Sequence, residues 1–187
     1  TASSSVAASS VALQSTTWTS NSWLSVSASI LLQSSTWTSN SWLSAGASIL
    51  LQSSTILKMA TSQPISTPLL SVSSGCALQG ANSTSGELYV NVSTFSLEGA
   101  LTAGMLHITA SVVEQAASST VSSNSVLYVS TDELLLGGTL LLPSGHLTLD
   151  VSGTLNMSSA DVTAAAVSVA AEHMSVRESS TLDVSGN

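Results

Sequence analysis

Charged side chains are scarce in this chain, and cations are almost absent. Of the 187 residues only 6% are charged, and Lys58 and Arg177 are the only lysine and arginine. Binding to nucleic acid requires clustered cations that neutralise phosphates, so a nucleic-acid partner is excluded. The formal net charge of −8 also makes an anionic membrane surface an unfavourable partner.

Cysteine and long apolar runs are equally limited. Cys76 is the single cysteine, so no disulfide can form within the chain. No window of about 18 residues is free of Ser, Thr, Asn or Gln, which argues against a membrane-spanning helix. A hydrophobic content of 43% and a mean hydropathy of +0.43 argue against intrinsic disorder. The composition therefore predicts a folded chain with few charges.

The N-terminal third contains a near-exact repeat. The segment Thr16–Thr36 recurs as Ser35–Thr55, a spacing of 19, and both copies contain the string WTSNSWLS. A repeat of this length indicates one structural unit that stacks on its copies. Stacking would place each repeated side chain over its equivalent. The resulting candidate aromatic ladder is Trp18 with Trp37 and Trp23 with Trp42, and the candidate turn ladder is Asn21 with Asn40.

Within each repeat, apolar and polar residues alternate with a period of two, which is typical of β-strands. In the second copy the polar or small residues Ser44, Gly46, Ser48 and Gln52 are expected to face outward. The apolar residues expected to face inward are Leu43, Ala45, Ala47, Ile49 and Leu51.

The C-terminal half repeats with a longer, more divergent period. A 39-residue shift places Leu88 on Leu127 and Leu97 on Leu136 without a gap. Because 39 is about twice 19, this shift indicates two turns of one coil that is 19 or 20 residues long. The string TLDVSG recurs at 148–153 and 181–186, a 33-residue offset that indicates a shorter or looped coil.

A unit of about 20 residues made of short β-segments cannot bury its apolar face alone and must stack on neighbours. We therefore predict an all-β fold, a single-stranded parallel β-solenoid with coils of 19–20 residues that forms an elongated rod. Residues 1–71 hold the near-exact repeats and residues 72–187 the divergent coils, within one continuous solenoid. Roughly nine or ten coils would span about 45 Å. At 160–174 an alanine-rich helix is the alternative, but the valines there keep no helical stripe.

The C-terminal half also carries a family resemblance. The segments Gly138–Ser159 and Ser179–Gly186 resemble the right-handed parallel β-helix repeats of filamentous-haemagglutinin-type adhesins. The resemblance covers roughly Ser85 to Asn187 and implies an extracellular fibrous or adhesive shaft. It carries over no functional residue, and the WTSNSWL repeats match no family.

Patterns that carry catalysis or bind metals are few. Glycoside hydrolysis needs two carboxylates, and Asp150 and Asp183, from the two TLDVSG copies, form the candidate pair on one face. No G-x-S-x-G motif is present to expose a nucleophilic serine. His107 and His146 are equivalent under the 39-residue shift, and two coils separate them too widely to share a metal ion. We expect no enzymatic activity, no metal and no cofactor.

Covalent glycans are a further expectation. Sequons begin at Asn82, Asn91 and Asn156, and alternation in LYVNVSTF predicts that Asn91 faces outward. With 44 serines and 20 threonines, O-linked glycans would solvate a surface that has few charges. An equally supported alternative is that these hydroxyl groups carry no glycan and instead cap turns and bind water.

The sequence predicts a structural protein of an extracellular fibre or filament, in which the coils either belong to a longer shaft or stack end to end, with self-association as its main interaction. Uncapped ends of a solenoid present unpaired strand edges, which favours such stacking. The alternatives are a carbohydrate-binding or adhesive surface module, an ice-binding protein and a polysaccharide-degrading enzyme. Their candidate residues are the four tryptophans, the threonines Thr17, Thr19, Thr36 and Thr38, and the pair Asp150 and Asp183, respectively.

Overall fold

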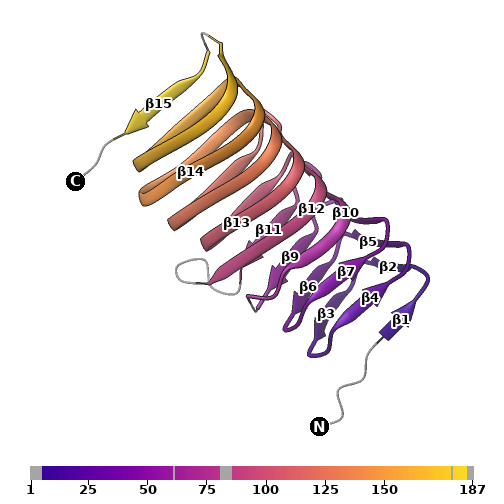
Figure 1. Ribbon diagram of the computed structural model, residues 1–187. Helices are drawn as coiled ribbons and strands as arrows, with labels where there is room; N and C mark the ends of the chain where they lie inside the picture. Colours follow the sequence, from indigo (N-terminus) through magenta and orange to yellow (C-terminus); the bar gives the residue numbers. More distant parts are fainter. Residues whose placement is uncertain (1–5, 61, 81–85, 178, 185–187) are drawn as a thin grey trace.

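The protein is a rod of stacked β-coils, with β1 (Val6–Ala8) and β15 (Thr181–Val184) at opposite ends (Figure 1). The computed structural model describes residues 6–60, 62–80, 86–177 and 179–184, and these ranges contain no helix. The chain makes about eight turns, and neighbouring coils pair through parallel strands. The predicted all-β parallel solenoid is therefore confirmed.

The strands between the two ends follow the coils in order. They are β2 (Val11–Gln14), β3 (Thr17–Ser20), β4 (Leu24–Val26), β5 (Ser29–Gln33), β6 (Thr36–Ser39), β7 (Leu43–Ala45), β8 (Ser48–Gln52), β9 (Ile56–Met59), β10 (Ile65–Val72), β11 (Ala77–Gly80), β12 (Glu87–Leu97), β13 (Ala100–Gln115) and β14 (Thr120–Val176).

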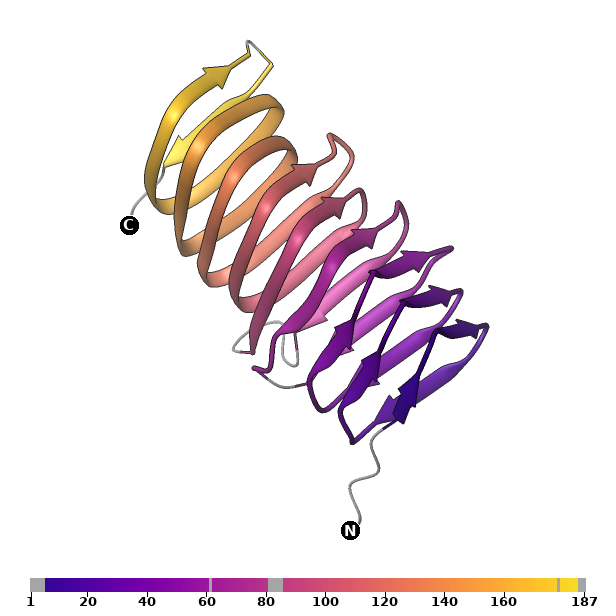
Figure 2. The same ribbon diagram turned by 45° about the vertical axis from the view of Figure 1, so that its right-hand side comes forward.

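Three short strands build each of the first coils: β1 to β3, then β4 to β6, then β7 to β9 (Figure 2). Ile30 pairs with Ile49 and Leu32 with Leu51, so the predicted 19-residue spacing is the coil length here. One corner recurs after each glutamine, where Ser15, Ser34 and Ser53 have positive φ angles of 52°, 49° and 55°. These left-handed residues turn the chain sharply enough to separate successive short strands.

The strands lengthen from β10 onward. β10 pairs with β7 and β8 on one side and with β12 on the other, so the stack is continuous across residue 71. β14, with 57 residues, winds around the rod instead of running straight (Figure 2). Leu70 pairs with Phe95, and more residues separate these two partners than separate Ile30 from its partner Ile49. Longer coils of this kind explain why the rod has fewer turns than the nine or ten that a uniform period of 19 gives.

The 39-residue shift is confirmed by the pairing of the later coils. Leu88 pairs with Leu106, and Leu106 pairs in turn with Leu127, so two coils carry the chain from Leu88 to Leu127. The 33-residue offset between the two TLDVSG strings is not a coil repeat, because Thr181–Val184 pairs with Asp161–Ala164 instead of with the first string.

Two local expectations have clear outcomes. Ala47, expected to face inward, is exposed, because it lies at the bend between β7 and β8, where the alternation of the strands is interrupted. Residues 160–174 are strand, since β14 continues to Val176. Ala160, Val162 and Ala164 are buried at alternate positions there, as the strand interpretation requires.

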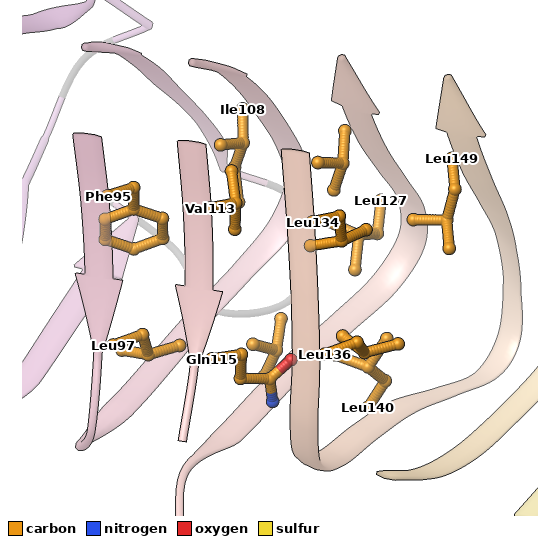
Figure 3. Close-up of a pocket in the computed structure, with 12 residues that line it drawn as sticks. Phe95, Leu97, Ile108, Val113, Gln115, Leu127, Leu134, Leu136, Leu140 and Leu149 are labelled. Carbon is orange, nitrogen blue, oxygen red and sulfur yellow. The ribbon is translucent and has the colours of Figure 1, made fainter. Parts of the chain in front are cut away.

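Inward side chains form continuous columns along the rod. We call two of them the Val11 column and the Leu13 column, and Figure 3 shows part of both on adjacent strands. Each rung adds mainly aliphatic surface to one shared core, so every coil is stabilised by the coils on either side. The Val11 column contains Val11, Ile30, Ile49, Leu70, Phe95, Val113 and Leu134, and the Leu13 column contains Leu13, Leu32, Leu51, Val72, Leu97, Gln115 and Leu136.

Candidate functional site

The first rung leaves the core partly open at the end that carries β1. Trp18 is 36% exposed, whereas Trp37, its partner in the next coil, is fully buried at 0%. Val11 and Leu13 are half-buried, although Ile30 and Leu32 directly above them are fully buried. The same inward positions therefore change from buried to accessible within one coil.

The last rung is open in the same way at the other end. Leu182 and Val184 pair with Val162 and Ala164. Leu182 is 51% exposed, whereas Val162 beneath it is 1% exposed. Met174 and Val176 are exposed as well. These four apolar side chains are the outermost members of core columns, and no further rung covers them among the described residues.

Both ends also present strand edges. In the described pairing, β1, β2 and β3 each pair with one strand only, β4, β5 and β6 respectively. β15 pairs with β14 alone. Such an edge offers backbone N–H and C=O groups to another parallel strand, and it lies beside the open apolar core. The two features together make each end a surface that fits a further coil.

The near-exact repeats add side-chain ladders to this stacking. Trp18 stacks on Trp37 with ring centroids 5.5 Å apart, and Trp23 stacks on Trp42 at 5.3 Å. The amide of Asn40 donates to Asn21 Oδ1. The arrangement repeats in Gln33, whose Nε2 donates to Gln52 Oε1 at 3.1 Å, and in Ser48, whose hydroxyl donates to Ser29 Oγ at 2.9 Å.

The tryptophans occupy two different environments. The Trp18 and Trp37 rings belong to the core, and the Trp37 indole N–H is buried without a hydrogen-bond partner. Trp23 and Trp42 are half-buried at a corner. Neither pair leaves both ring faces open, because each ring is covered by its copy. Stacking between coils therefore accounts for the ladder without a ligand.

The three sequons differ in accessibility. Asn91 is exposed on β12, two residues before exposed Ser93. Asn156 is half-buried, and its Oδ1 is buried without a hydrogen-bond partner. Asn82 lies outside the described residues. Among the two described sequons, only Asn91 offers an outward acceptor for a glycan.

The residues proposed for the alternative functions are arranged as follows. Thr17 pairs with Thr36 and Thr19 with Thr38, but the next rung replaces the threonines with Ile56 and Lys58. The threonine array thus spans two rungs.

The candidate acid pair is not aligned. Asp183 pairs with Thr163, whereas Asp150 lies in a shallow hollow with Asp132, Ser130 and Ser152. The expectation that Asp150 and Asp183 stack on one face was wrong, because the 33-residue offset between the two TLDVSG strings does not correspond to a coil.

The interior cavity found among the described residues is too small for a ligand larger than water. A cavity of about 20 Å³ lies among Phe95, Gln115 and the surrounding aliphatic side chains (Figure 3). This volume holds about one water molecule. In the described ranges, no three His, Cys, Asp or Glu side chains are grouped to hold a metal ion. Nor do the same ranges contain a helix that could cross a membrane.

The structure contains an outward aromatic column that was not predicted from the sequence. Tyr89, His107 and Tyr128 are paired in successive coils on β12, β13 and β14. The Tyr89 hydroxyl donates to Glu87 Oε2 at 3.3 Å. Partial burial raises the pKa of Tyr89 above 10.0, and the negative charge of Glu87 and this hydrogen bond raise it further. The two coil advances that join these residues are unequal, so a uniform period does not reveal the column.

Comparison with protein-family models, with curated proteins and with solved structures gives no match.

Proposed function

We propose that this protein is a structural β-solenoid that associates end to end into an extracellular filament. The observation that carries the proposal is the continuity of the core columns, which run through the rod and are open at both ends. Val11 and Leu13 are half-buried at one end, and Met174 and Val176 are exposed at the other. A second copy placed in line would bury both sets of side chains.

The register of such a junction follows from the fold. One coil after Leu134 and Leu136, the alternation continues with buried Leu155 and Met157. The Arg177 N–H donates to the Met157 carbonyl, and this bond places Val176 beside Met157. The exposed pair Met174 and Val176 therefore continues the two columns. In a head-to-tail junction, the Val11 column of one copy meets Met174 of the next, and the Leu13 column meets Val176.

Charge favours this polarity. No charged residue precedes Lys58, so the end that carries β1 is uncharged. The opposite end carries exposed Glu172, Arg177 and Asp183. A junction between two such ends would place two charged rungs against each other, whereas a head-to-tail junction places an uncharged rung against a charged one. Because a head-to-tail contact does not close on itself, it continues as an open filament.

The extracellular and adhesive parts of the proposal rest on the sequence. The resemblance to filamentous-haemagglutinin-type repeats supports a shaft at the cell surface, and the accessible Asn91 supports N-glycosylation. Abundant exposed serines and threonines support O-glycans on a rod with few charges. The predicted effect of enzymatic deglycosylation is a thinner filament of unchanged axial repeat.

A pair of variants tests the junction. Val176→Asp places a carboxylate in the open end of the Leu13 column, where stacking would bury it without a partner. Ser175→Asp adds the same charge to the adjacent residue, which points outward by alternation. Sedimentation velocity at rising concentration is expected to show large assemblies for the wild type and for Ser175→Asp, and only monomers for Val176→Asp. Equal assembly by both variants would refute the proposed junction.

A further inference from the structure

The outward aromatic column lies beside a hollow that the self-association proposal does not use. Tyr89 and His107 stack with ring centroids 4.7 Å apart and an interplanar angle of 10°, and Tyr128 follows at 6.1 Å with a tilt of 44°. All three rings are half-buried. They come from β12, β13 and β14, which cross the rod side by side in successive coils (Figure 1).

The hollow adjoins the Tyr89 end of this column. Ser62, Pro64, Tyr89, Asn91, His107 and Thr109 line it, together with the edge of Val90. His107 covers one side of the Tyr89 ring. Pro64 precedes Ile65, which pairs with Val90. The proline therefore lies beside Tyr89 in the preceding coil, on the side away from His107. An aromatic ring and a proline ring thus form apolar walls within one shallow depression.

Neutral polar groups surround these walls. Asn91 and Thr109 are paired on adjacent strands, and both are exposed. Ser62 adds a third exposed polar side chain. The amide and the two hydroxyl groups both donate and accept hydrogen bonds. Glu87 accepts the hydrogen bond of the Tyr89 hydroxyl, which fixes the orientation of the ring.

The absence of lysine and arginine from the lining of the hollow favours a neutral ligand. Neither cation of the chain lines the hollow. Lys58 pairs with Gln79 on β11, and Arg177 lies in the last coil. A phosphate, sulfate or uronic acid would therefore find neither a lysine nor an arginine as its countercharge. A sugar ring, by contrast, combines an apolar C–H face for an aromatic wall with hydroxyl groups for amides and alcohols.

We propose that this hollow is a binding subsite for a neutral pyranose unit of an oligosaccharide. The C–H face of the sugar packs on Tyr89 and Pro64, and its hydroxyl groups bond to Thr109 and to the amide of Asn91, which takes this role in molecules that carry no glycan at this sequon. The paired polar residues Asn91, Thr109 and Ser130 continue along the rod from coil to coil, so a longer chain can follow the same line. The site lies on the side of the rod, away from both ends, and does not depend on filament formation.

The test uses four neutral probes, the hexasaccharides of cellulose, starch, β-mannan and chitin, with an oligogalacturonate as the anionic control. Isothermal titration calorimetry is expected to show saturable binding of at least one neutral probe and none of the control. Tyr89→Ala is expected to weaken that binding by about tenfold or more, because it removes the aromatic wall. Asn91→Ala is expected to weaken it by a smaller factor.

Tyr128→Ala is the matched control. It removes the same side chain from the same column, but Tyr128 does not line the hollow, so affinity should change by less than about twofold. Circular dichroism checks that each variant is folded, and sedimentation checks that filament formation is unchanged. The proposal is overturned if none of the neutral probes binds at millimolar concentration, or if Tyr89→Ala and Tyr128→Ala weaken binding equally.

Discussion

The same truncation should have very different costs in the middle and at the end of the rod. Leu78 pairs with Leu57 on one side and Leu101 on the other and is fully buried at 0% exposure. Leu182 pairs with Val162 on one side only and is 51% exposed. Leu78→Ala removes buried surface and leaves a cavity between two rungs, which costs about 3 kcal/mol. Leu182→Ala leaves no enclosed cavity, and half of the side chain is already in water, so we expect about 1 kcal/mol.

Urea unfolding measures both values, at protein concentrations low enough to keep the chain monomeric. The free energy of unfolding should fall about three times more for Leu78→Ala than for Leu182→Ala. At high concentration, Leu182→Ala should also weaken self-association, whereas Leu78→Ala should affect it only through stability. An equally large loss for both variants in dilute solution would mean that the Leu182 end is covered in the monomer, and the reasoning from open columns would fail.

Three further outcomes follow from single contacts. A Cβ atom at Gly99 would lie 2.3 Å from the Cys76 carbonyl oxygen, so Gly99→Ala should lower the free energy of unfolding by about 2 kcal/mol or more, and a change below about 0.5 kcal/mol in urea unfolding would contradict the packing of this corner. Cys76 is only 2% exposed, so its thiol should react with Ellman's reagent no faster than the chain unfolds. Rapid reaction in the native state would disprove its burial. Glu87→Gln should lower the pKa of Tyr89, which is raised in the folded state. The stability linked to that raised pKa is present below pH 10.0 and is lost as pH rises through the folded value. Titration of the phenolate absorbance tests this shift, and an unchanged pKa would exclude the influence of Glu87.

Much of the fold was predictable because stacking imposes identity on equivalent positions. The 19-residue spacing between Trp18 and Trp37 is the register in the structure, and the 39-residue shift is the sum of two real coil advances. Alternation identified Ile49 and Leu51 as core residues, and both are fully buried. These predictions succeed because each inward column must remain apolar through many coils.

The remaining features depend on corners, where the chain length per coil varies. Ala47 keeps the apolar alternation but lies at a bend, so its side chain is exposed. The register shifts between Ala103 and Met105, which changes the advance from one coil to the next. A constant period also hides the stack of Tyr89 on His107, because the advance from β12 to β13 differs from the advance from β13 to β14. The similarity of the two TLDVSG strings gave the wrong prediction that Asp150 and Asp183 stack. A short sequence match does not determine which coils are neighbours or which face of the rod a residue occupies.

The central claim is that rods join head to tail through continuous core columns. Cryo-electron microscopy of the concentrated wild-type protein tests it most directly. We expect unbranched filaments whose strands run across the axis with a spacing of about 4.8 Å, uninterrupted at the junction between copies. Met174 and Val176 should lie directly against Val11 and Leu13 of the next copy. Filaments whose copies contact each other through the sides of the rods, or a field of single rods at high concentration, would contradict the account.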